Sequence, residues 1–396
     1  MRLWDVNNVI NSTVLQFTVG DDDQLDMQLI LYDCQASIAH AKTLEKAGIL
    51  TPEERRQIEN ALTALIELIQ KGQFTIHPQQ EDMHTAIEDY LTQKLGDTGK
   101  KIHTARSRND QVLAALRLFY KDHLNRIQQM VKKLQTVLKD FEQKHTAVPL
   151  PGYTHTRKAM PFTVGAWSHA FYSAMVDNHQ VVQWVTEIID QSPLGSGAGF
   201  GVPIELDREY TARLLGFSRV QENPLYVQNS RGKFEALILQ AFTQIAMDLN
   251  RLASDLIFFT QPELGFFKLP DSFVTGSSIM PQKRNPDVLE LMRAYYHRLV
   301  AHLMEVHTIV GDLISGYHRD YQLTKKPVLE SFGIIEQLLN VSIELVKHLE
   351  VDEAACQQAM TPDLFATQKV YELVKQGVPF REAYRRVASE IRKKSP

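Results

Sequence analysis

Cysteine is scarce in this chain of 396 residues: there are two, Cys34 and Cys356, and they stand far apart. Such a pair supplies neither a disulfide framework nor the closely spaced ligands of a zinc site. The sequence also lacks a run of about 18 apolar residues, which a membrane-spanning helix needs. Its N-terminus lacks the basic and apolar regions of a signal peptide. We therefore expect a cytoplasmic protein that does not cross a membrane.

An excess of positive charge is missing as well, because 43 Lys and Arg residues face 47 Asp and Glu residues, a net charge of −4. Proteins that bind nucleic acid in general carry a basic excess, so we expect no nucleic-acid partner. Hydrophobic residues make up 44% of the chain and charged residues 23%, as in ordinary globular proteins. This composition excludes a disordered or collagen-like chain, and the length suggests more than one domain.

Glycine and proline are absent between Lys100 and Val148, where the strongest pattern of the sequence lies. Apolar residues recur from Leu113 to Phe141 at steps of three and four, which predicts one amphipathic helix of about 35 residues. Five long helices without convincing strand alternation between them predict an all-α helical bundle. The other four helices are expected over residues 162–190, 233–259, 287–310 and 328–349.

Helices this long bury poorly within a single subunit, so we expect them to pack against other subunits as well. An elongated monomeric bundle is the alternative. Before the bundle, the sequence predicts shorter helices, one over 26–47 and one that starts at Thr51, with Glu54 completing a capping box. After it, small helices end in a basic, solvated segment. We thus predict three domains: an N-terminal helical domain (1–105), the long-helix bundle (106–349) and a short C-terminal helical domain (350–396).

The loop before the fourth long helix gathers residues suited to chemistry. Its sequence over 271–287 is DSFVTGSSIMPQKRNPD, which places Ser277 and Lys283 near the N-terminus of the helix that starts at about Pro286. Helix N-termini and cations bind anions, and such a field lowers the cost of forming a serine alkoxide. A flexible polar loop is the ordinary explanation of this composition. However, GSSIMPQKRNP resembles the G-S-S-x-M-P-x-K-x-N-P signature of the fumarase/aspartase superfamily at every fixed position.

That resemblance implies both a chemistry and an assembly. Members of the superfamily are helical homotetramers whose five-helix bundles form a twenty-helix core, flanked in each subunit by two smaller helical domains. Each active site combines loops from three different subunits. The enzymes eliminate fumarate from a substrate that bears a succinyl group, and this chemistry needs no metal and no organic cofactor. We therefore expect a cofactor-free lyase that works as a homotetramer with shared active sites.

A second motif, HTARSRNDQ at 103–111, comes immediately before the first long helix. Taken generically, it predicts a helix N-cap at Asn109 or Asp110 with surface charges around it. It also resembles the H-T-G-R-S-R-N-D-Q motif of the argininosuccinate lyase family, with Ala105 in place of the glycine. The loop SPLGSGAGFG at 192–201 lacks a preceding strand, so it is a weak candidate for a dinucleotide loop. It resembles the P-L-G-S-G-A loop of the same family.

The segment PGYTHTRKAMP places His155 on a turn that follows two prolines. A lone histidine is usually structural or solvent-exposed. The segment is similar to the G-Y-T-H motif of the argininosuccinate lyase family, whose histidine takes part in proton transfer, although Thr156 and several later residues depart from the usual continuation. Glu290 lies one turn into the helix expected over 287–310, which follows the loop of Ser277. It corresponds to the carboxylate that partners this histidine. A carboxylate partner would orient the imidazole and hold its charge.

The segment YHRDYQLTK at 317–325 indicates the substrate branch. It could be a polar loop between two helices, but its Y-x-R-D-x-Q-x-x-K spacing resembles the argininosuccinate lyase segment that holds the arginine-like end of the substrate. Tyrosine and glutamine hydrogen-bond polar groups, and lysine suits a carboxylate. The family resemblance as a whole implies a set of substrate-binding residues: His84, Ser107, Arg108, Asn109, Thr154, Asn285, Tyr317, Gln322 and Lys325.

One departure concerns Asp22, which stands where the family usually has a substrate-binding serine. An aspartate there would either pair with a cationic group of the substrate or point away from it. A second departure is length, because the family commonly continues well beyond this point. The predicted third domain is therefore short.

The resemblance implies cleavage of argininosuccinate into arginine and fumarate by anti-elimination, a step of arginine biosynthesis. Ser277 is the expected base, and Lys283 with backbone N–H groups would stabilise the dianionic intermediate. His155, charged and paired with Glu290, is the expected acid or its relay. The alternatives are a superfamily lyase that cleaves adenylosuccinate or aspartate, and a catalytically silent homologue such as the lens δ-crystallins. The two branch-specific motifs argue against the former, and the intact set of catalytic residues argues against the latter.

Overall fold

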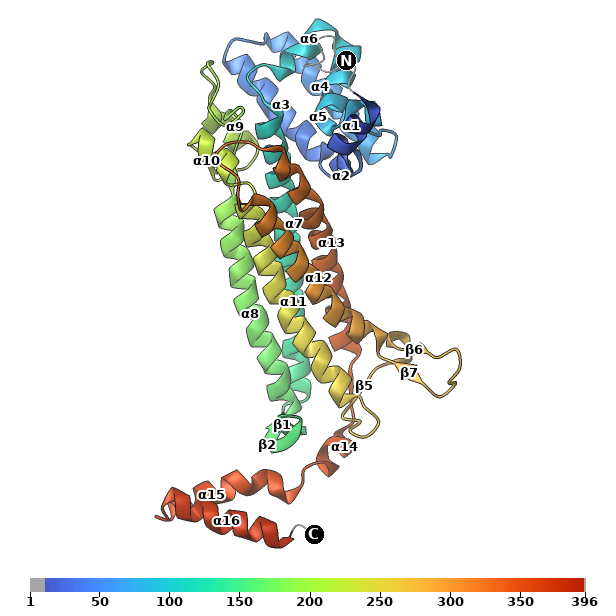
Figure 1. Ribbon diagram of the computed structural model, residues 1–396, viewed down its shortest axis with the longest axis vertical. Coiled ribbons are helices and arrows are strands. Elements are labelled where there is room, and N and C mark those ends of the chain that lie inside the picture. Colours follow the sequence, from blue (N-terminus) through green and yellow to red (C-terminus); the bar gives the residue numbers. More distant parts are fainter. Residues whose placement is uncertain (1–10, 395–396) are drawn as a thin grey trace. The chain divides into compact units, whose positions relative to one another are not determined.

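The computed structural model describes residues 11–394 and is built mainly from α-helices (Figure 1). The chain divides into two compact units and passes between them repeatedly. Unit 1 comprises the described residues up to Gln128 together with Val181–Ala241 and Val300–Gly333. Unit 2 comprises Gln129–Gln180, Phe242–Leu299 and the described residues from Ile334 onward.

All five predicted long helices are present in the described chain, and their bounds agree with the predicted ones to within a few residues. The first has 37 residues. The last begins before Pro327, because a proline in the first turn removes no hydrogen bond within the helix. The all-α fold class is therefore confirmed, and each long helix has a part in each unit. The helices are α7 (Arg108–Lys144), α8 (Val164–Ile189), α11 (Lys233–Phe259), α12 (Asp287–Val310) and α13 (Lys325–His348).

Unit 1 also holds the shorter helices of the N-terminal segment. Thr51 caps α4 as predicted: Glu54 N–H donates to Thr51 Oγ1 (3.2 Å), and Thr51 N–H donates to the Glu54 carboxylate (3.0 Å). The helix predicted over 26–47 is α3 (Ile30–Lys46), which begins four residues later, after a turn at 27–29. The short helices of unit 1 are α1 (Ser12–Val19), α2 (Asp22–Asp26), α3 (Ile30–Lys46), α4 (Pro52–Gln70), α5 (Met83–Leu95), α6 (Asp97–Lys100), α9 (Arg208–Leu214) and α10 (Pro224–Asn229).

The core of unit 1 joins three of the long helices through aromatic and polar contacts. Tyr120 of α7 stacks on Phe332 of α13 with ring centroids 5.7 Å apart. Its hydroxyl donates to the carboxylate of Glu235 on α11 over 3.1 Å. Arg117 is fully buried and donates to the Gln191 carbonyl over 2.9 Å. Burying such polar groups is tolerable because each of them has a hydrogen-bond partner.

The start of α7 corrects the predicted N-cap at Asn109 or Asp110. The cap is Ser107: its Oγ accepts from Asn109 N–H (3.3 Å), and its own N–H donates to the Asp110 carboxylate (2.9 Å). The short serine side chain reaches the free N–H groups of the first turn, and Asp110 returns the bond as in a capping box. Asp110 thus belongs to the cap without being the N-cap residue.

Unit 2 contains the other parts of the long helices, held together by side-chain hydrogen bonds. Ser168 of α8 donates to the Leu138 carbonyl of α7 over 2.8 Å, and Trp167 of α8 donates to Asp255 of α11 over 2.9 Å. The C-terminal segment forms small helices, as predicted, and its α-helices are α14 (Glu353–Gln358), α15 (Ala366–Lys375) and α16 (Phe380–Lys394). No helix among residues 11–394 is long and apolar enough to cross a membrane.

Short strands occur between the helices, contrary to the sequence prediction. β1 (Pro149–Thr154) and β2 (Arg157–Thr163) form an antiparallel hairpin in unit 2. Three prolines and a bulge interrupt the regular alternation there, so the pattern is hard to detect. The other pairs have two residues per strand: β3 (Gln191–Ser192) with β4 (Arg219–Val220), β5 (Phe267–Lys268) with β8 (Glu350–Val351), and β6 (Thr275–Gly276) with β7 (Arg284–Asn285).

Candidate active site

Unit 1 contains a cavity of about 450 Å³ that brings together segments far apart in the sequence. Helix α2, the start of α5, the segment before α7, and the segment that leads into α13 all contribute to its lining. Most of the predicted substrate-binding residues lie here: His84, Ser107, Arg108, Asn109, Tyr317, Gln322 and Lys325.

The charge of Lys325 is already paired within the cavity. Its ammonium donates to Asp22 Oδ1 (2.9 Å) and to Asp26 Oδ1 (2.7 Å), and only 6% of its side chain is exposed. Burial lowers the pKa of Lys325, but the carboxylates of Asp26 and Asp22 outweigh burial and raise it overall. Burial also raises the pKa of Asp22, while Lys325 opposes this. Sequence reasoning missed Asp26. It left open whether the side chain of Asp22 points toward the substrate or away from it, and in the structure Asp22 lines the cavity.

His84 and Arg108 are both held by carboxylates. His84 Nδ1 lies 2.7 Å from Asp33 Oδ2. Burial lowers the pKa of His84, but the charge and hydrogen bond of Asp33 outweigh it, so the net shift is upward. Arg108 pairs with Asp82 over 2.8 Å and donates to Thr85 Oγ1 over 2.7 Å. These contacts fix the orientation of both side chains at the cavity wall.

Asp110 connects the start of α7 to the glycine-rich loop at 192–201. Its Oδ2 accepts from the N–H groups of Gly195 (3.1 Å) and Gly197 (2.9 Å). Burial raises the pKa of Asp110 to about 6, although these N–H groups and Arg106 oppose the shift. Both glycines have left-handed φ angles, 84° and 58°, which glycine adopts without steric cost. The loop at 192–201 therefore has a structural role. In the sequence, the one sign of this contact is that Asp110 belongs to the motif at 103–111.

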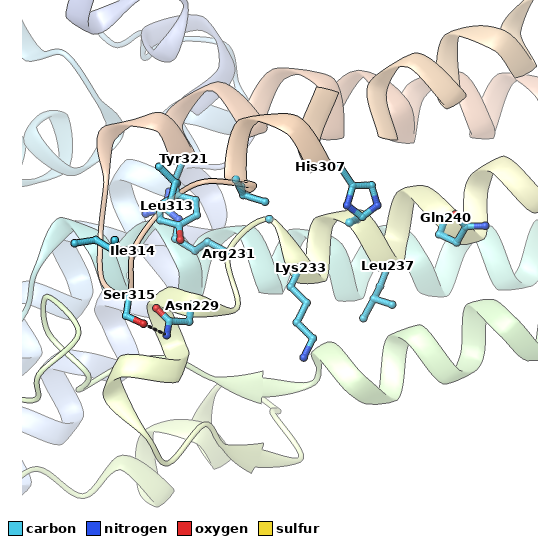
Figure 2. A pocket seen from close by; sticks show the side chains of 13 residues that line it. Asn229, Arg231, Lys233, Leu237, Gln240, His307, Leu313, Ile314, Ser315 and Tyr321 are labelled. Atoms are coloured by element: carbon cyan, nitrogen blue, oxygen red, sulfur yellow. Dashed lines mark hydrogen bonds between the residues drawn. The ribbon is translucent and has the colours of Figure 1, made fainter. Parts of the chain in front are cut away.

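Arg231 is a cavity residue that sequence reasoning missed. Its guanidinium lies over the rings of Tyr317 (5.2 Å) and Tyr321 (5.0 Å), and only 7% of the residue is exposed. Figure 2 shows it beside Tyr321 at the edge of a second cavity, of about 500 Å³. Among residues 11–394, no carboxylate forms an ion pair with Arg231, and Nη1 is buried without a hydrogen-bond partner. A single arginine before a long helix gives no sequence signal of this environment.

Thr154 and His155 lie in unit 2, at the tip of the β1–β2 hairpin. Both are exposed. His155 and Thr156 form its two-residue turn, and both have left-handed φ angles, 53° and 57°. Such angles are typical of tight hairpin turns but strained for a β-branched residue. Within residues 11–394, the imidazole of His155 makes no ion pair with Glu290, which is exposed on the first turn of α12.

The loop that precedes α12 presents Ser277, Lys283 and Asn285 in unit 2. The strand pair β6–β7 closes the loop, and Asn285 lies in β7. Ser277 Oγ accepts from the N–H groups of Met280 (3.1 Å) and Ile279 (3.3 Å). Lys283 is exposed, and so is Ile279, at 86%. N–H groups aimed at a serine oxygen stabilise negative charge on it, so the local geometry suits a serine alkoxide.

Comparison with known proteins identifies the family. A family model described as Lyase matches residues 11–300. The argininosuccinate lyase of Thermotoga neapolitana is 53% identical over 389 residues, which cover 98% of each chain. The enzyme of the same name from Sorangium cellulosum is 45% identical and covers 99% of this chain and 91% of its own.

The chain belongs to the argininosuccinate lyase family. The family consists of lyases, so the prediction of a lyase from the motifs is confirmed. Among solved structures, an EDDS lyase in complex with formate is 25% identical, with a TM-score of 0.82 over 96% of this chain and 76% of its own. A class II fumarase from Schistosoma mansoni, 16% identical, has a TM-score of 0.79 over 94% of this chain and 91% of its own, and so shares the fold.

Among the described residues, no group of three or more His, Cys, Asp or Glu side chains is arranged to hold a metal ion.

Proposed function

We propose that the protein cleaves argininosuccinate into arginine and fumarate, as a step of arginine biosynthesis. The observation that carries the proposal is the cavity of unit 1, where residues of two separate family motifs, 103–111 and 317–325, line one space together with His84. The 53% identity with an argininosuccinate lyase over almost the whole chain supports the same reaction. No other substrate is favoured by a feature of the cavity.

The mechanism we propose is an anti-elimination. Ser277 Oγ removes the proton from the carbon next to a carboxylate of the succinyl group, and the resulting charge spreads onto that carboxylate. Lys283 and backbone N–H groups of the loop stabilise this dianionic intermediate. The C–N bond then breaks, fumarate forms, and the leaving guanidino nitrogen takes up a proton from His155 or from a relay through it, with Glu290 as the carboxylate that holds the imidazolium. Thr154 and Asn285 would bind the substrate near these groups.

We further propose that the protein works in the cytoplasm as a homotetramer with shared active sites. The expected binding residues of unit 1 and the expected catalytic residues of unit 2 lie in different units. His155, Lys283 and Glu290 are solvent-exposed in the single chain, although acid–base and electrostatic catalysis work best where water is excluded. Neighbouring subunits would supply the missing walls. Each subunit would consist of the three predicted domains, 1–105, 106–349 and 350–396.

An assay of fumarate release by ultraviolet absorbance tests the function. The purified protein should release fumarate from argininosuccinate and not from adenylosuccinate or aspartate. Release from adenylosuccinate alone would replace the proposed substrate, and no release from any of the three would favour a silent homologue. Mixing His155→Asn with Ser277→Ala subunits, followed by dissociation and reassembly, should restore part of the activity. Failure to restore any would contradict shared active sites.

A further inference from the structure

The second cavity of unit 1, drawn in Figure 2, has no role in the reaction proposed above. It has a volume of about 500 Å³ and lies between the start of α11 and the end of α12 with the segment that follows it. None of the predicted catalytic or substrate-binding residues lines it. Among the described residues, Arg231 alone lines both this cavity and the cavity of the candidate active site.

Positive charge without a matching carboxylate characterises the second cavity. Arg231 and Lys233 line it, and His307 adds an imidazole, whereas none of the described residues of its lining is Asp or Glu. With the imidazole neutral, the lining carries a charge of about +2 at pH 7. Lys233 is exposed, and its ammonium donates to a neutral acceptor, the hydroxyl of Tyr226, over 3.2 Å. Because α11 begins at Lys233, the partial positive charge of a helix N-terminus is added there. These features attract an anion.

Arg231 gives an independent indication that a ligand completes the cavity. The residue is 7% exposed, and its Nη1 is buried without a hydrogen-bond partner among residues 11–394. The carboxylate of Glu235 acts on it electrostatically, but the two oxygens of that carboxylate already accept from the hydroxyl of Tyr120 (3.1 Å) and from Gly232 N–H (2.7 Å). A buried donor without an acceptor costs stability. A ligand oxygen that accepts from this guanidinium would remove that cost.

The rest of the wall is largely aliphatic. Leu237, Val310 and Ile314 line the cavity, and Figure 2 shows Leu237 near Lys233 on α11 and Ile314 on the segment after α12. Ile314 is 76% exposed, so its apolar surface is available to a ligand. Burial of aliphatic surface favours binding roughly in proportion to the area that is removed from water. The second cavity therefore suits a molecule with an apolar body and one anionic end.

We propose that the second cavity binds an amphipathic carboxylate, with its anionic end at Arg231 and Lys233 and a short aliphatic body on Leu237, Val310 and Ile314. A guanidinium offers a carboxylate two parallel N–H donors, and the exposed ammonium adds a second positive charge. Inorganic phosphate has no apolar part and leaves the aliphatic wall in water. This site is distinct from the cavity of the candidate active site, and the inference does not depend on the reaction proposed above.

Ligand-observed NMR titration of the assembled protein with hexanoate tests the proposal. Hexanamide has the same chain without the charge, so it should bind at least about tenfold more weakly, the effect of losing hydrogen bonds to a charged group. Inorganic phosphate should also bind more weakly, because it lacks the aliphatic body. Lys233→Gln should weaken hexanoate binding about two- to fivefold, as expected for an exposed ion pair. Lys100→Gln is the matched control and should leave the affinity unchanged, because this exposed lysine of unit 1 pairs with Asp97 and lines neither cavity.

A pair of arginine variants locates the bound hexanoate. Arg231→Gln should weaken its binding at least about tenfold, whereas Arg319→Gln, which changes the lining of the candidate active site alone, should have no effect. Equal losses in the two variants would place hexanoate in the candidate active site and overturn the proposal. No binding of hexanoate, or equal affinities for hexanoate and hexanamide, would overturn it as well.

The exposed Lys233 keeps the test decisive if Arg231→Gln fails to fold. The size of the Lys233→Gln assembly is measured by size-exclusion chromatography next to its hexanoate affinity. A changed oligomeric state with an unchanged affinity would show that a second subunit covers the cavity, and the proposal would be wrong. A weakened affinity with an unchanged oligomeric state is the expected result.

Discussion

Replacement of Asp110 tests whether the glycine-rich loop depends on the start of α7. Its carboxylate accepts three backbone N–H groups, from Ser107, Gly195 and Gly197, at 2.9, 3.1 and 2.9 Å. Asp110→Ala leaves all three donors without this acceptor. An unsatisfied buried donor costs about 1–3 kcal/mol. Gly197 is buried, and the other two residues are half-buried, so that water can partly replace the bond.

We therefore expect Asp110→Ala to lower the free energy of unfolding by about 3–5 kcal/mol, with the buried donor near the top of its range and the others near the bottom. Asp110→Asn is the informative companion. An asparagine oxygen can still accept from Gly195 and Gly197, but its NH2 group then faces the Ser107 N–H. That variant should lose about 1–3 kcal/mol, the cost of one unsatisfied polar contact.

Urea unfolding followed by tryptophan fluorescence measures both variants at one fixed protein concentration, because the apparent stability of an oligomer depends on concentration. The slope of the transition should stay constant while the midpoint falls in the order wild type, Asp110→Asn, Asp110→Ala. A loss below about 1 kcal/mol for Asp110→Ala would refute the reasoning, since it would mean that the three N–H groups find other partners at little cost.

Three further outcomes follow from other parts of the chain. Ala105 has a left-handed φ of 59°. Glycine relieves the strain of this angle but adds entropy to the unfolded chain, so Ala105→Gly should raise the free energy of unfolding by up to about 1 kcal/mol. A lower midpoint in urea would contradict this. Ser277→Ala should lower kcat by roughly 10²–10⁴-fold with an unchanged thermal midpoint, and near-normal turnover would exclude Ser277 as the base. Because the pKa of His84 is raised in the folded state, protonation of this histidine stabilises the fold. The contribution is complete below the pKa of the unfolded state, about 6.5, and it is lost as the pH rises through the folded pKa. The thermal midpoint of wild type should therefore fall more steeply above that pH than the midpoint of His84→Gln, and parallel curves would show that His84 has no such role.

Much of the fold was predictable because its largest elements depend on short-range periodicity. A pattern such as that from Leu113 to Phe141 commits one face of a helix to burial over many turns, and the observed α7 includes all of it. The hairpin at 149–163 escaped prediction because its prolines and bulge break the alternation that identifies strands. The N-cap of α7 was misplaced by two or three residues, since Ser107, Asn109 and Asp110 are all residues that favour caps.

The candidate site shows a different limit, which Lys325 illustrates. The motif identifies the residue, but the chemistry of a lysine depends on what surrounds its ammonium, and Asp22 and Asp26 are about 300 positions away in the chain. Arg231 is the converse case: the sequence around it is unremarkable, yet its guanidinium is buried and forms no ion pair with a carboxylate of residues 11–394.

In one chain, the expected catalytic residues lie on exposed or strained segments. His155 sits on a strained turn and Ser277 on a loop whose neighbouring Ile279 is almost fully exposed. Strained turns and exposed apolar side chains persist when they contribute to function or to an interface. Residue type and spacing identify these groups as candidates, because the proposed reaction would use a base and an acid. Their pairing and burial depend on which surfaces meet. The ion pair between His155 and Glu290 is not formed within residues 11–394 of a single chain, so we expect it to form only where subunits assemble.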